Sequence, residues 1–256
     1  MLINILQGLF IGVALVLPGL SAGTVILIMG FYQVLLDDLS SLRLKKYLPL
    51  LAGAAVGALA SIYAVDYLFA RFNSIITAII FGMLVASVPA VLNHQKGNKI
   101  KIRPLLFALA GFAFAWFIIC DPSSTFTILP PGGYFHFFLG GVLSSATMLL
   151  PGVSGSAVLV IMTLYDDVIR AFSQWQWINL LFLGAGFVVG LFGLARLLSA
   201  LCRRFQADIS FLLGGLILGS TRALLPVALT PAFFIYALAG AAVVLYLTRK
   251  RIGLTR

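Results

Sequence analysis

Two short segments of the chain place small hydroxyl side chains directly after a Pro-Gly pair. The first reads Pro18-Gly19-Leu20-Ser21-Ala22-Gly23-Thr24 and the second reads Pro151-Gly152-Val153-Ser154-Gly155-Ser156. A helix that begins after such a break presents unpaired backbone N–H groups and the positive end of its dipole. Glycine lets a ligand approach the backbone closely and hydroxyls add donors, so each segment predicts a site for an anion such as a phosphate or a carboxylate.

The same residues also allow a plainer interpretation. Ser21 and Ser154 could cap their own helices, and Gly23 and Gly155 could permit tight packing between helices. For one segment alone this interpretation would be preferred. The presence of two matching segments favours a binding site.

Two arginines are candidate partners for a bound anion, because an uncompensated charge in a membrane is costly. Arg71 and Arg204 are each followed by Phe and then by an amide residue. Both are expected near helix ends, where an arginine could instead extend to the membrane surface and act only as a topology signal. Among the acids, Asp66 lies well inside an apolar stretch and could carry a coupling proton or pair with Arg71. Asp37-Asp38 is expected to be an interfacial charge pair at a helix end.

The remaining residues form no catalytic or metal-binding pattern. The sequence has no P-loop, no convincing nucleophile–base set and no metal-ligand spacing, and Cys120 and Cys202 lie far apart without a partner motif. We therefore predict no catalytic residue, no metal, no cofactor, and a protein that is not an enzyme.

Both segments belong to a repeat with a spacing of 133 residues. Other matching pairs are Gly53 and Gly186, Arg71-Phe72 and Arg204-Phe205, and Gly82 and Gly215. We predict a first repeat over 1–133 and a second over 134–256. In a membrane protein, broken helices at matching positions of two halves point to a transport site.

Composition indicates that the chain lies in a membrane. Of its 256 residues, 62% are hydrophobic and only 9% are charged, which is more apolar surface than a soluble core of this size requires. The net charge of +10 could suggest nucleic acid, but the basic residues cluster in short segments between apolar runs. That pattern is typical of topology signals and lipid-headgroup contact, so we predict a bilayer partner and no nucleic acid.

The apolar runs predict an all-α polytopic membrane protein. A spanning helix needs roughly 20 apolar residues, and runs of about that length cover 48–70, 74–92, 104–120, 178–200, 208–225 and 231–248. The two motif regions are shorter and broken, so each predicts a re-entrant helical hairpin. The first hairpin covers 3–36, with arms 3–17 and 20–36 around Pro18-Gly19. The second covers 137–169, with arms 137–150 and 153–169 around Pro151-Gly152.

Basic residues orient this arrangement. The loop after the first hairpin, the loop after the second span, Arg203-Arg204 and the C-terminal tail hold most of the cations, so the positive-inside rule places them and both termini in the cytoplasm. The connection at 71–74 then lies outside. Each half holds one hairpin and three spans, an odd number, so the halves are predicted to be inverted, an arrangement suited to alternating access. The N-terminus lacks a basic leader region and is expected to belong to the mature protein.

The two motifs also resemble a known family. Gly12-Val13-Ala14, Leu17-Pro18-Gly19-Leu20-Ser21-Ala22-Gly23-Thr24 and Gly30-Phe31-Tyr32 are similar to the first signature of the bacterial polyprenyl-phosphate transporter family. Leu150-Pro151-Gly152-Val153-Ser154-Gly155-Ser156 and Tyr165-Asp166 are similar to its second signature. The resemblance covers nearly the whole chain. Ala22 and Thr163 stand where the family usually has glycine, and Gln33 stands where an acid is common.

The resemblance implies transport of undecaprenyl phosphate, the lipid carrier of cell-wall and surface-polysaccharide assembly, back to the inner leaflet of the bacterial cytoplasmic membrane. From the duplicated hairpin we expect the phosphate to bind at Ser21, Gly23, Thr24, Ser154, Gly155 and Ser156, with Arg71 and Arg204 supplying charge from opposite sides. Three alternatives stay open: an ion-coupled transporter of a small soluble anion, a membrane module that organises a partner enzyme, and a pseudo-symmetric membrane scaffold that transports nothing. The sequence does not fix the oligomeric state, and a homodimer is one of the forms that it allows.

Overall fold

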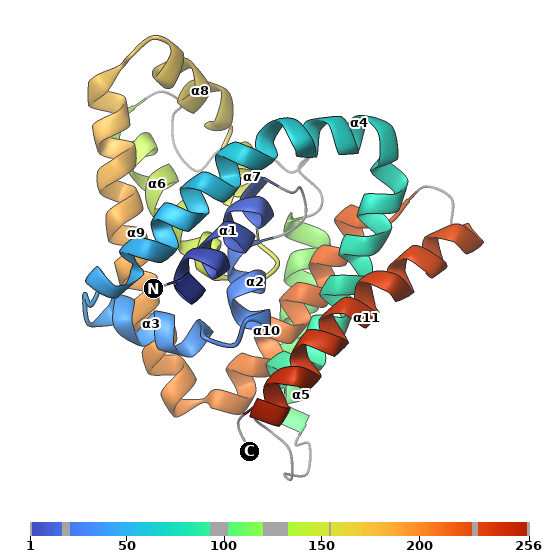
Figure 1. Ribbon diagram of the computed structural model, residues 1–256. Coiled ribbons are helices and arrows are strands. Elements are labelled where there is room, and N and C mark those ends of the chain that lie inside the picture. The colour runs from blue at the N-terminus through green and yellow to red at the C-terminus, as the bar shows by residue number, and fades with distance from the viewer. Residues whose placement is uncertain are drawn as a thin grey trace.

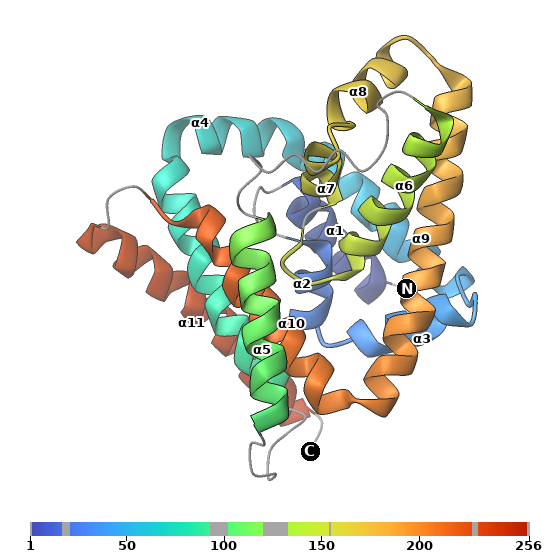
Figure 2. The same cartoon turned by 180° about the vertical axis from the view of Figure 1, so that it is seen from behind.

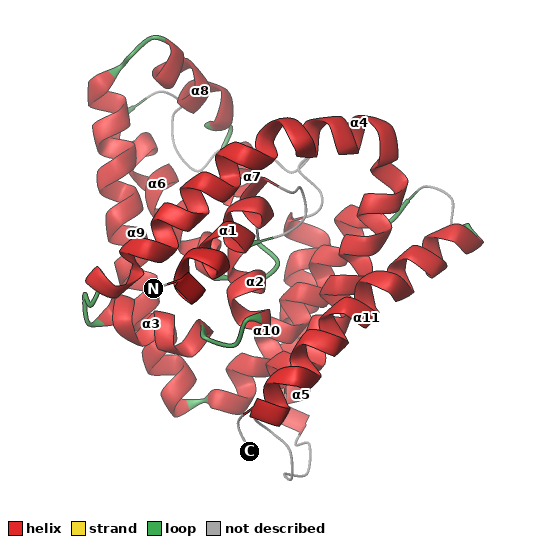
Figure 3. Cartoon of the chain, in the orientation of Figure 1, coloured by secondary structure: helices red, strands yellow, loops and turns green. Residues whose placement is uncertain are grey.

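The computed structural model describes residues 2–16, 21–92, 102–119, 133–153, 155–226 and 230–254, and every regular element in these ranges is a helix (Figure 3). The predicted all-α class is therefore confirmed for this part of the chain. Pro18, Gly19 and Ser154 lie outside the described residues, as do the side chains of Asp66 and Ser156.

The elements follow the order expected from the repeat (Figure 1). In the first half they are α1 (Leu2–Val16), α2 (Ala22–Ile28), α3 (Tyr32–Ser40), a 3₁₀ turn (Lys45–Tyr47), α4 (Leu48–Leu92) and α5 (Ile102–Phe114), which continues as a π-helical turn (Ala115–Ile119). In the second half they are α6 (Tyr134–Leu149), α7 (Gly155–Ile161), α8 (Tyr165–Ser173), α9 (Trp177–Arg204), α10 (Gln206–Ser220), a 3₁₀ turn (Thr221–Leu224) and α11 (Pro231–Leu254).

The connection expected at 71–74 is a bend within one helix and not a loop. Helix α4 covers both predicted spans, 48–70 and 74–92, and bends at Phe72, whose φ and ψ are −132° and 31°. The matching corner between α9 and α10 lies at Phe205, with φ and ψ of −129° and 48°. The bend of α4 and the α9–α10 corner lie at opposite ends of the molecule (Figures 1 and 2).

The second arm of each hairpin was expected to be one helix, and this expectation is wrong. The arm 20–36 divides into α2 and α3, which are bent by 118° relative to each other. The arm 153–169 divides into α7 and α8. The physical reason is a positive φ at matching positions, 69° at Gly30 and 56° at Thr163, because a residue in the left-handed region ends a right-handed helix. Glycine adopts this conformation easily, whereas the β-branched Thr163 is strained in it.

Helix lengths support membrane insertion. Within the described residues, three helices are long and apolar enough to cross a membrane by length and composition: Ala70–Pro89, Trp177–Arg204 and Gln206–Leu224. The bent pair of α2 and α3 would be a fourth if it counts as one span. The predicted spans 104–120 and 231–248 coincide with apolar helices that are shorter, Ile102–Phe117 and Pro231–Tyr246. The first arm of α4, over 48–70, is not among these helices, and several of its side chains lie outside the described part.

Glycines bring the helices into close pairs at the repeat spacing. A Cβ at Gly53 would lie 2.3 Å from the carbonyl oxygen of Ile5, and a Cβ at Gly186 would lie 2.0 Å from that of Phe138. Helix α1 therefore packs on the first arm of α4 in the same way as α6 packs on α9.

The last helix of each half packs on the other half. A Cβ at Gly82, in the second arm of α4, would lie 1.8 Å from the carbonyl oxygen of Ala237 in α11. Its counterpart Gly215, in α10, is equally close to Ala108 in α5, at 2.0 Å. Figure 2 shows α5 beside α10 and α11 beside the descending arm of α4. Each half thus packs its last helix on the other half, and these contacts hold the two halves together.

Candidate functional site

The start of α2, from Ser21 to Thr24, follows the predicted break at Pro18-Gly19 and is a buried helix N-terminus; we call it the tip of the first hairpin. Ser21 is the N-cap of α2, and its hydroxyl accepts a hydrogen bond from the Gly23 N–H at 3.2 Å. Its carbonyl accepts a second hydrogen bond from the Thr24 N–H at 3.0 Å. Ser21 and Gly23 are buried, and Thr24 is fully enclosed. The capping role considered from the sequence is therefore present in this conformation.

The tip of the first hairpin meets the break of the second. The Gly152 N–H donates to the Thr24 hydroxyl at 3.0 Å, and the Ser21 hydroxyl donates to the Leu150 carbonyl at 3.4 Å. The Tyr32 hydroxyl, which is also buried, donates to the Leu149 carbonyl at 2.8 Å. These three hydrogen bonds join residues more than 115 positions apart in the chain.

Gly152 and Gly23 make this contact possible. Gly152 has a φ of 82°, and a Cβ there would lie 2.8 Å from the Ser220 hydroxyl and 3.0 Å from the Leu216 carbonyl oxygen. A Cβ at Gly23 would lie 3.1 Å from the Leu149 carbonyl oxygen, so a larger residue would push the tips apart. The glycine of the Pro151-Gly152 break thus allows both the turn of the chain and the close approach of the two hairpin backbones.

The N–H and hydroxyl groups at the two tips are hydrogen-bond donors for an oxyanion, and no charged side chain is among them. The N–H groups of Gly152 and Gly23 both donate to hydroxyl oxygens. An oxyanion can replace a hydroxyl oxygen as the acceptor of an N–H group, and it binds more strongly because the hydrogen bond is charge-assisted. The position of α2 adds the positive end of a helix dipole.

The other predicted site residues lie elsewhere. Gly155 is the first residue of α7, where its carbonyl accepts from the Ser144 hydroxyl at 3.0 Å and its Cα faces the Ser144 backbone, so it also serves close packing of α7 on α6. Arg71 is exposed beside the bend of α4. Arg204 is exposed at the end of α9, with its guanidinium 5.4 Å from the ring centroid of Phe205. The structure therefore brings the two tips together but keeps both arginines at the helix corners, on opposite ends of the molecule.

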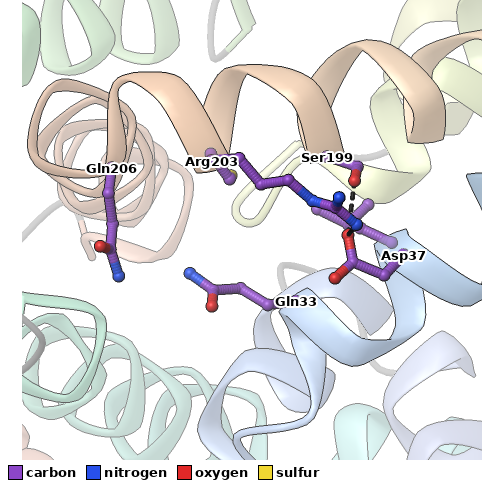
Figure 4. Close-up of a pocket in the computed structure, with 7 residues that line it drawn as sticks. Gln33, Asp37, Ser199, Arg203 and Gln206 are labelled. Atoms are coloured by element: carbon purple, nitrogen blue, oxygen red, sulfur yellow. Dashed lines mark hydrogen bonds and ion pairs between the residues drawn. The ribbon is translucent and has the colours of Figure 1, made fainter.

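A polar cluster between α3 and α9 was missed by the sequence reasoning (Figure 4). The Asp37 carboxylate accepts from the Ser199 hydroxyl at 2.5 Å and lies 3.0 Å from the Arg203 guanidinium. These side chains border a cavity of about 190 Å³ that Gln33 and Gln206 also line. The Nε of Arg196 donates to the Ser40 carbonyl at 3.2 Å and adds a second link between the two helices. Asp37 is thus a partner of α9 and more than an interfacial charge.

Its neighbour Asp38 fixes α3 to the start of α4. Asp38 forms an ion pair with Lys46 and accepts from the Tyr47 hydroxyl at 2.7 Å. Burial, together with the adjacent Asp38 carboxylate, raises the pKa of Tyr47, so the phenol stays protonated and keeps donating at physiological pH.

A second cavity of about 260 Å³ adjoins the polar cluster. It shares Gln33 and Cys202 with the first cavity, and its other lining residues are mainly apolar. They are Leu27, Gly30, Tyr32, Val34, Val91, Ser210 and Leu213. A polar and an apolar compartment therefore lie side by side along α3.

Comparisons with known proteins agree with the motifs. The VCA0040-like family model, described as undecaprenyl phosphate translocase-like, matches residues 1–98 and 64–241. A polyprenyl-phosphate transporter of Vibrio cholerae is 30% identical over 239 residues, which are 84% of this chain and 74% of that protein. A polyprenyl-phosphate transporter of Staphylococcus aureus is 25% identical over 245 residues, which are 88% of this chain and 86% of that protein. No solved structure matches the chain significantly. The chain therefore belongs to the undecaprenyl phosphate translocase-like family.

Proposed function

We propose that this protein transports undecaprenyl phosphate from the outer to the inner leaflet of the bacterial cytoplasmic membrane, where the carrier is reused in envelope polysaccharide synthesis. The observation that carries the proposal is the hydrogen bond from the Gly152 N–H to the Thr24 hydroxyl, because it joins the tips of two equivalent hairpins at one point. The names of the two relatives support polyprenyl phosphate as the substrate.

The phosphate binds where the tips now bind each other. Its oxygens replace the hydroxyls of Thr24 and Ser21 as acceptors for the Gly152 and Gly23 N–H groups, and the freed hydroxyls become donors to it. Ser154, Gly155 and Ser156 supply the equivalent groups from the second hairpin. Binding and tip contact therefore compete for the same donors, and this competition couples arrival of the headgroup to separation of the tips.

In this proposal transport occurs by alternating access, because the two halves have opposite orientations in the membrane. The corners at Phe72 and Phe205 lie at opposite ends of the molecule, which supports an inverted arrangement. With Arg203-Arg204 and the Lys45–Tyr47 segment in the cytoplasm, the α4 bend lies outside. Each hairpin then gates one side of the membrane. Arg71 and Arg204, one at each corner, attract the phosphate at the outer and inner surfaces, while the prenyl chain stays in lipid.

Native mass spectrometry tests the proposal. The wild-type protein and the Ser21→Ala/Ser154→Ala variant are each purified and mixed with undecaprenyl phosphate, undecaprenol or inorganic phosphate. Selective binding of the phosphorylated lipid is expected, falling about 10-fold or more in the variant, because hydrogen bonds to a charged group contribute about 1.5–3 kcal/mol each.

The control is Ser40→Ala/Ser173→Ala, a second pair at the repeat spacing whose hydroxyls bond only carbonyls of their own helices. It should bind like the wild type. Equal binding of undecaprenol, or binding that survives loss of Ser21 and Ser154, would refute the site. Preference for inorganic phosphate would favour a transporter of small soluble anions instead.

A further inference from the structure

The two hairpins occupy different environments although their sequences match. Helix α3 packs along α9, whereas its counterpart α8 has no comparable packing on α4 among the described residues. Tyr32 is 6% exposed and bonds the Leu149 carbonyl, whereas its counterpart Tyr165 is 42% exposed. The asymmetry lies in the second arms: α3 is docked on a long helix of the other half, and α8 is not comparably docked on α4 among the described residues.

The hydrophobic core shows the same asymmetry. Residues of α2 and α3 belong to the main core, together with residues of α1, α4, α9 and α10. The segment 155–173, which holds α7, α8 and their connection, instead contributes Met162, Leu164, Val168 and Ala171 to a small separate cluster with Phe137 of α6. Among the described residues α8 therefore packs on α7 and α9 of its own half, and it leaves Tyr165, Ile169 and Phe172 exposed.

A set of polar contacts holds the first hairpin in its docked position. Asp37 of α3 bonds Ser199 and pairs with Arg203, both on α9. Ser199 is only 6% exposed, so its hydroxyl lies inside the α3–α9 interface and not at its rim. We call this set, Asp37 with Ser199 and Arg203, the α3–α9 latch.

Two members of this latch have charged counterparts at the repeat spacing. The counterpart of Asp37 is Arg170 on α8, and the counterpart of Ser199 is Asp66 on α4, whereas Arg203 corresponds to Ala70. Arg170 and Asp66 therefore carry opposite charges, with the cation on α8 and the acid on α4. In the present structure Arg170 pairs with Asp167 of its own helix at 3.4 Å, and its side chain is 60% exposed.

We propose that the protein has a second conformation, in which α8 docks on the first arm of α4 through an ion pair between Arg170 and Asp66, while α3 leaves α9. The inference rests on the alternating access of the proposed function. In that conformation the Tyr165 hydroxyl donates to a carbonyl at the end of α1, the counterpart of Leu149. Arg170, Asp66 and Tyr165 are then positioning residues of the transport cycle, and Asp66 acts as a latch partner and not as a partner of Arg71.

The positions of the basic residues indicate which side of the membrane the present conformation closes. The α3–α9 latch lies beside Lys46 and Arg203-Arg204, the basic residues assigned to the cytoplasm. The cytoplasmic side is therefore closed here by the α3–α9 latch, whereas on the outer side α8 does not pack comparably on α4 among the described residues. This is the conformation that accepts a lipid from the outer leaflet.

Cysteine cross-linking tests the proposal without requiring a known substrate. In a background of Cys120→Ser and Cys202→Ser, one variant carries Asp37→Cys/Ser199→Cys and another carries Asp66→Cys/Arg170→Cys. Copper phenanthroline in native membranes should cross-link both pairs, each in part of the population. A third variant, Arg170→Cys/Gln206→Cys, joins opposite ends of the molecule and should not cross-link. Cross-linking of the first pair without the second would overturn the proposal.

Charge exchange provides an independent readout. Arg170→Asp and Asp66→Arg should each lower return of undecaprenyl phosphate in proteoliposomes about 10-fold, and the double exchange should restore it. Failure of the double exchange to restore transport would also overturn the latch. If both pairs cross-link but no polyprenyl phosphate moves, the latch stands and the proposed substrate fails. If the lipid moves but Asp66→Cys/Arg170→Cys never cross-links, the proposed function stands and the latch fails.

Discussion

At the scale of single residues, the Thr24 hydroxyl is one of three hydroxyls that join the two hairpins, and it is the one that accepts a backbone N–H. Thr24 is fully buried, and its oxygen accepts the hydrogen bond of the Gly152 N–H. An N–H group that loses its acceptor in a buried contact costs about 1–3 kcal/mol. Thr24 should therefore matter for stability as well as for binding.

Thr24→Val tests this role because valine has nearly the same shape without the hydroxyl. We expect an apparent loss of about 1–3 kcal/mol, measured as a lower unfolding temperature in detergent. Thr24→Ser keeps the hydroxyl and should retain most of the stability. Thr77→Val is the control, since that hydroxyl bonds only carbonyls of its own helix at an exposed position, and it should change stability by less than about 0.5 kcal/mol. Equal stability of Thr24→Val and the wild type would contradict the contact.

At the scale of elements, glycines decide how close the helices lie. In a membrane, helices do not gain by hiding apolar side chains from lipid, so close backbone packing contributes much of their association. Gly82 and Gly215 each place a backbone against the last helix of the other half. These two contacts hold the exchanged helices α11 and α5 in place.

Gly82→Ala tests this packing. Its added methyl group would overlap the Ala237 carbonyl oxygen, so α11 must move away, at a cost of about 1–3 kcal/mol. The change should lower the unfolding temperature and increase proteolysis at the C-terminal helix. Gly193→Ala is the matched control, because a Cβ there meets no atom within 4 Å. It should be neutral or slightly stabilising, since alanine favours helix. Similar losses in both variants would contradict the α4–α11 contact as the cause, because alanine by itself favours the helix.

At the scale of the whole molecule, the question is how the two halves face the membrane. Asn73 and Gln206 are counterparts at the repeat spacing, and both are exposed next to a helix corner. If the halves are inverted, these two positions lie on opposite sides of the bilayer. If the halves are parallel, they lie on the same side.

Single cysteines at these positions distinguish the two arrangements. In the background without Cys120 and Cys202, Asn73→Cys should react with a membrane-impermeant maleimide in intact cells. Gln206→Cys should react only after the membrane is permeabilised. Labelling of both variants in intact cells, or of neither, would contradict the inverted arrangement. Denatured samples, in which both cysteines react, control for expression.

Much of the architecture followed from the sequence, because its causes are local. Apolar runs predict helices in a membrane, and the repeated Pro-Gly pairs predict where they break. Every regular element in the described residues is a helix, as the apolar runs predict. The sequence missed the second break in each hairpin, since a single residue with positive φ, such as Thr163, leaves little trace in an apolar pattern.

The sequence by itself determined the helical class, the internal repeat and the family, since composition, spacing and two signatures are properties of the chain order. Only the tertiary structure decided which hydroxyls meet which amides, that the last helices exchange between halves, and that Asp37 belongs to α9. These features depend on contacts between residues more than 100 positions apart, such as Thr24 with Gly152 and Asp37 with Ser199. The asymmetry between Tyr32 and Tyr165 is of the same kind, because two matching sequences can differ in burial only through what packs against them.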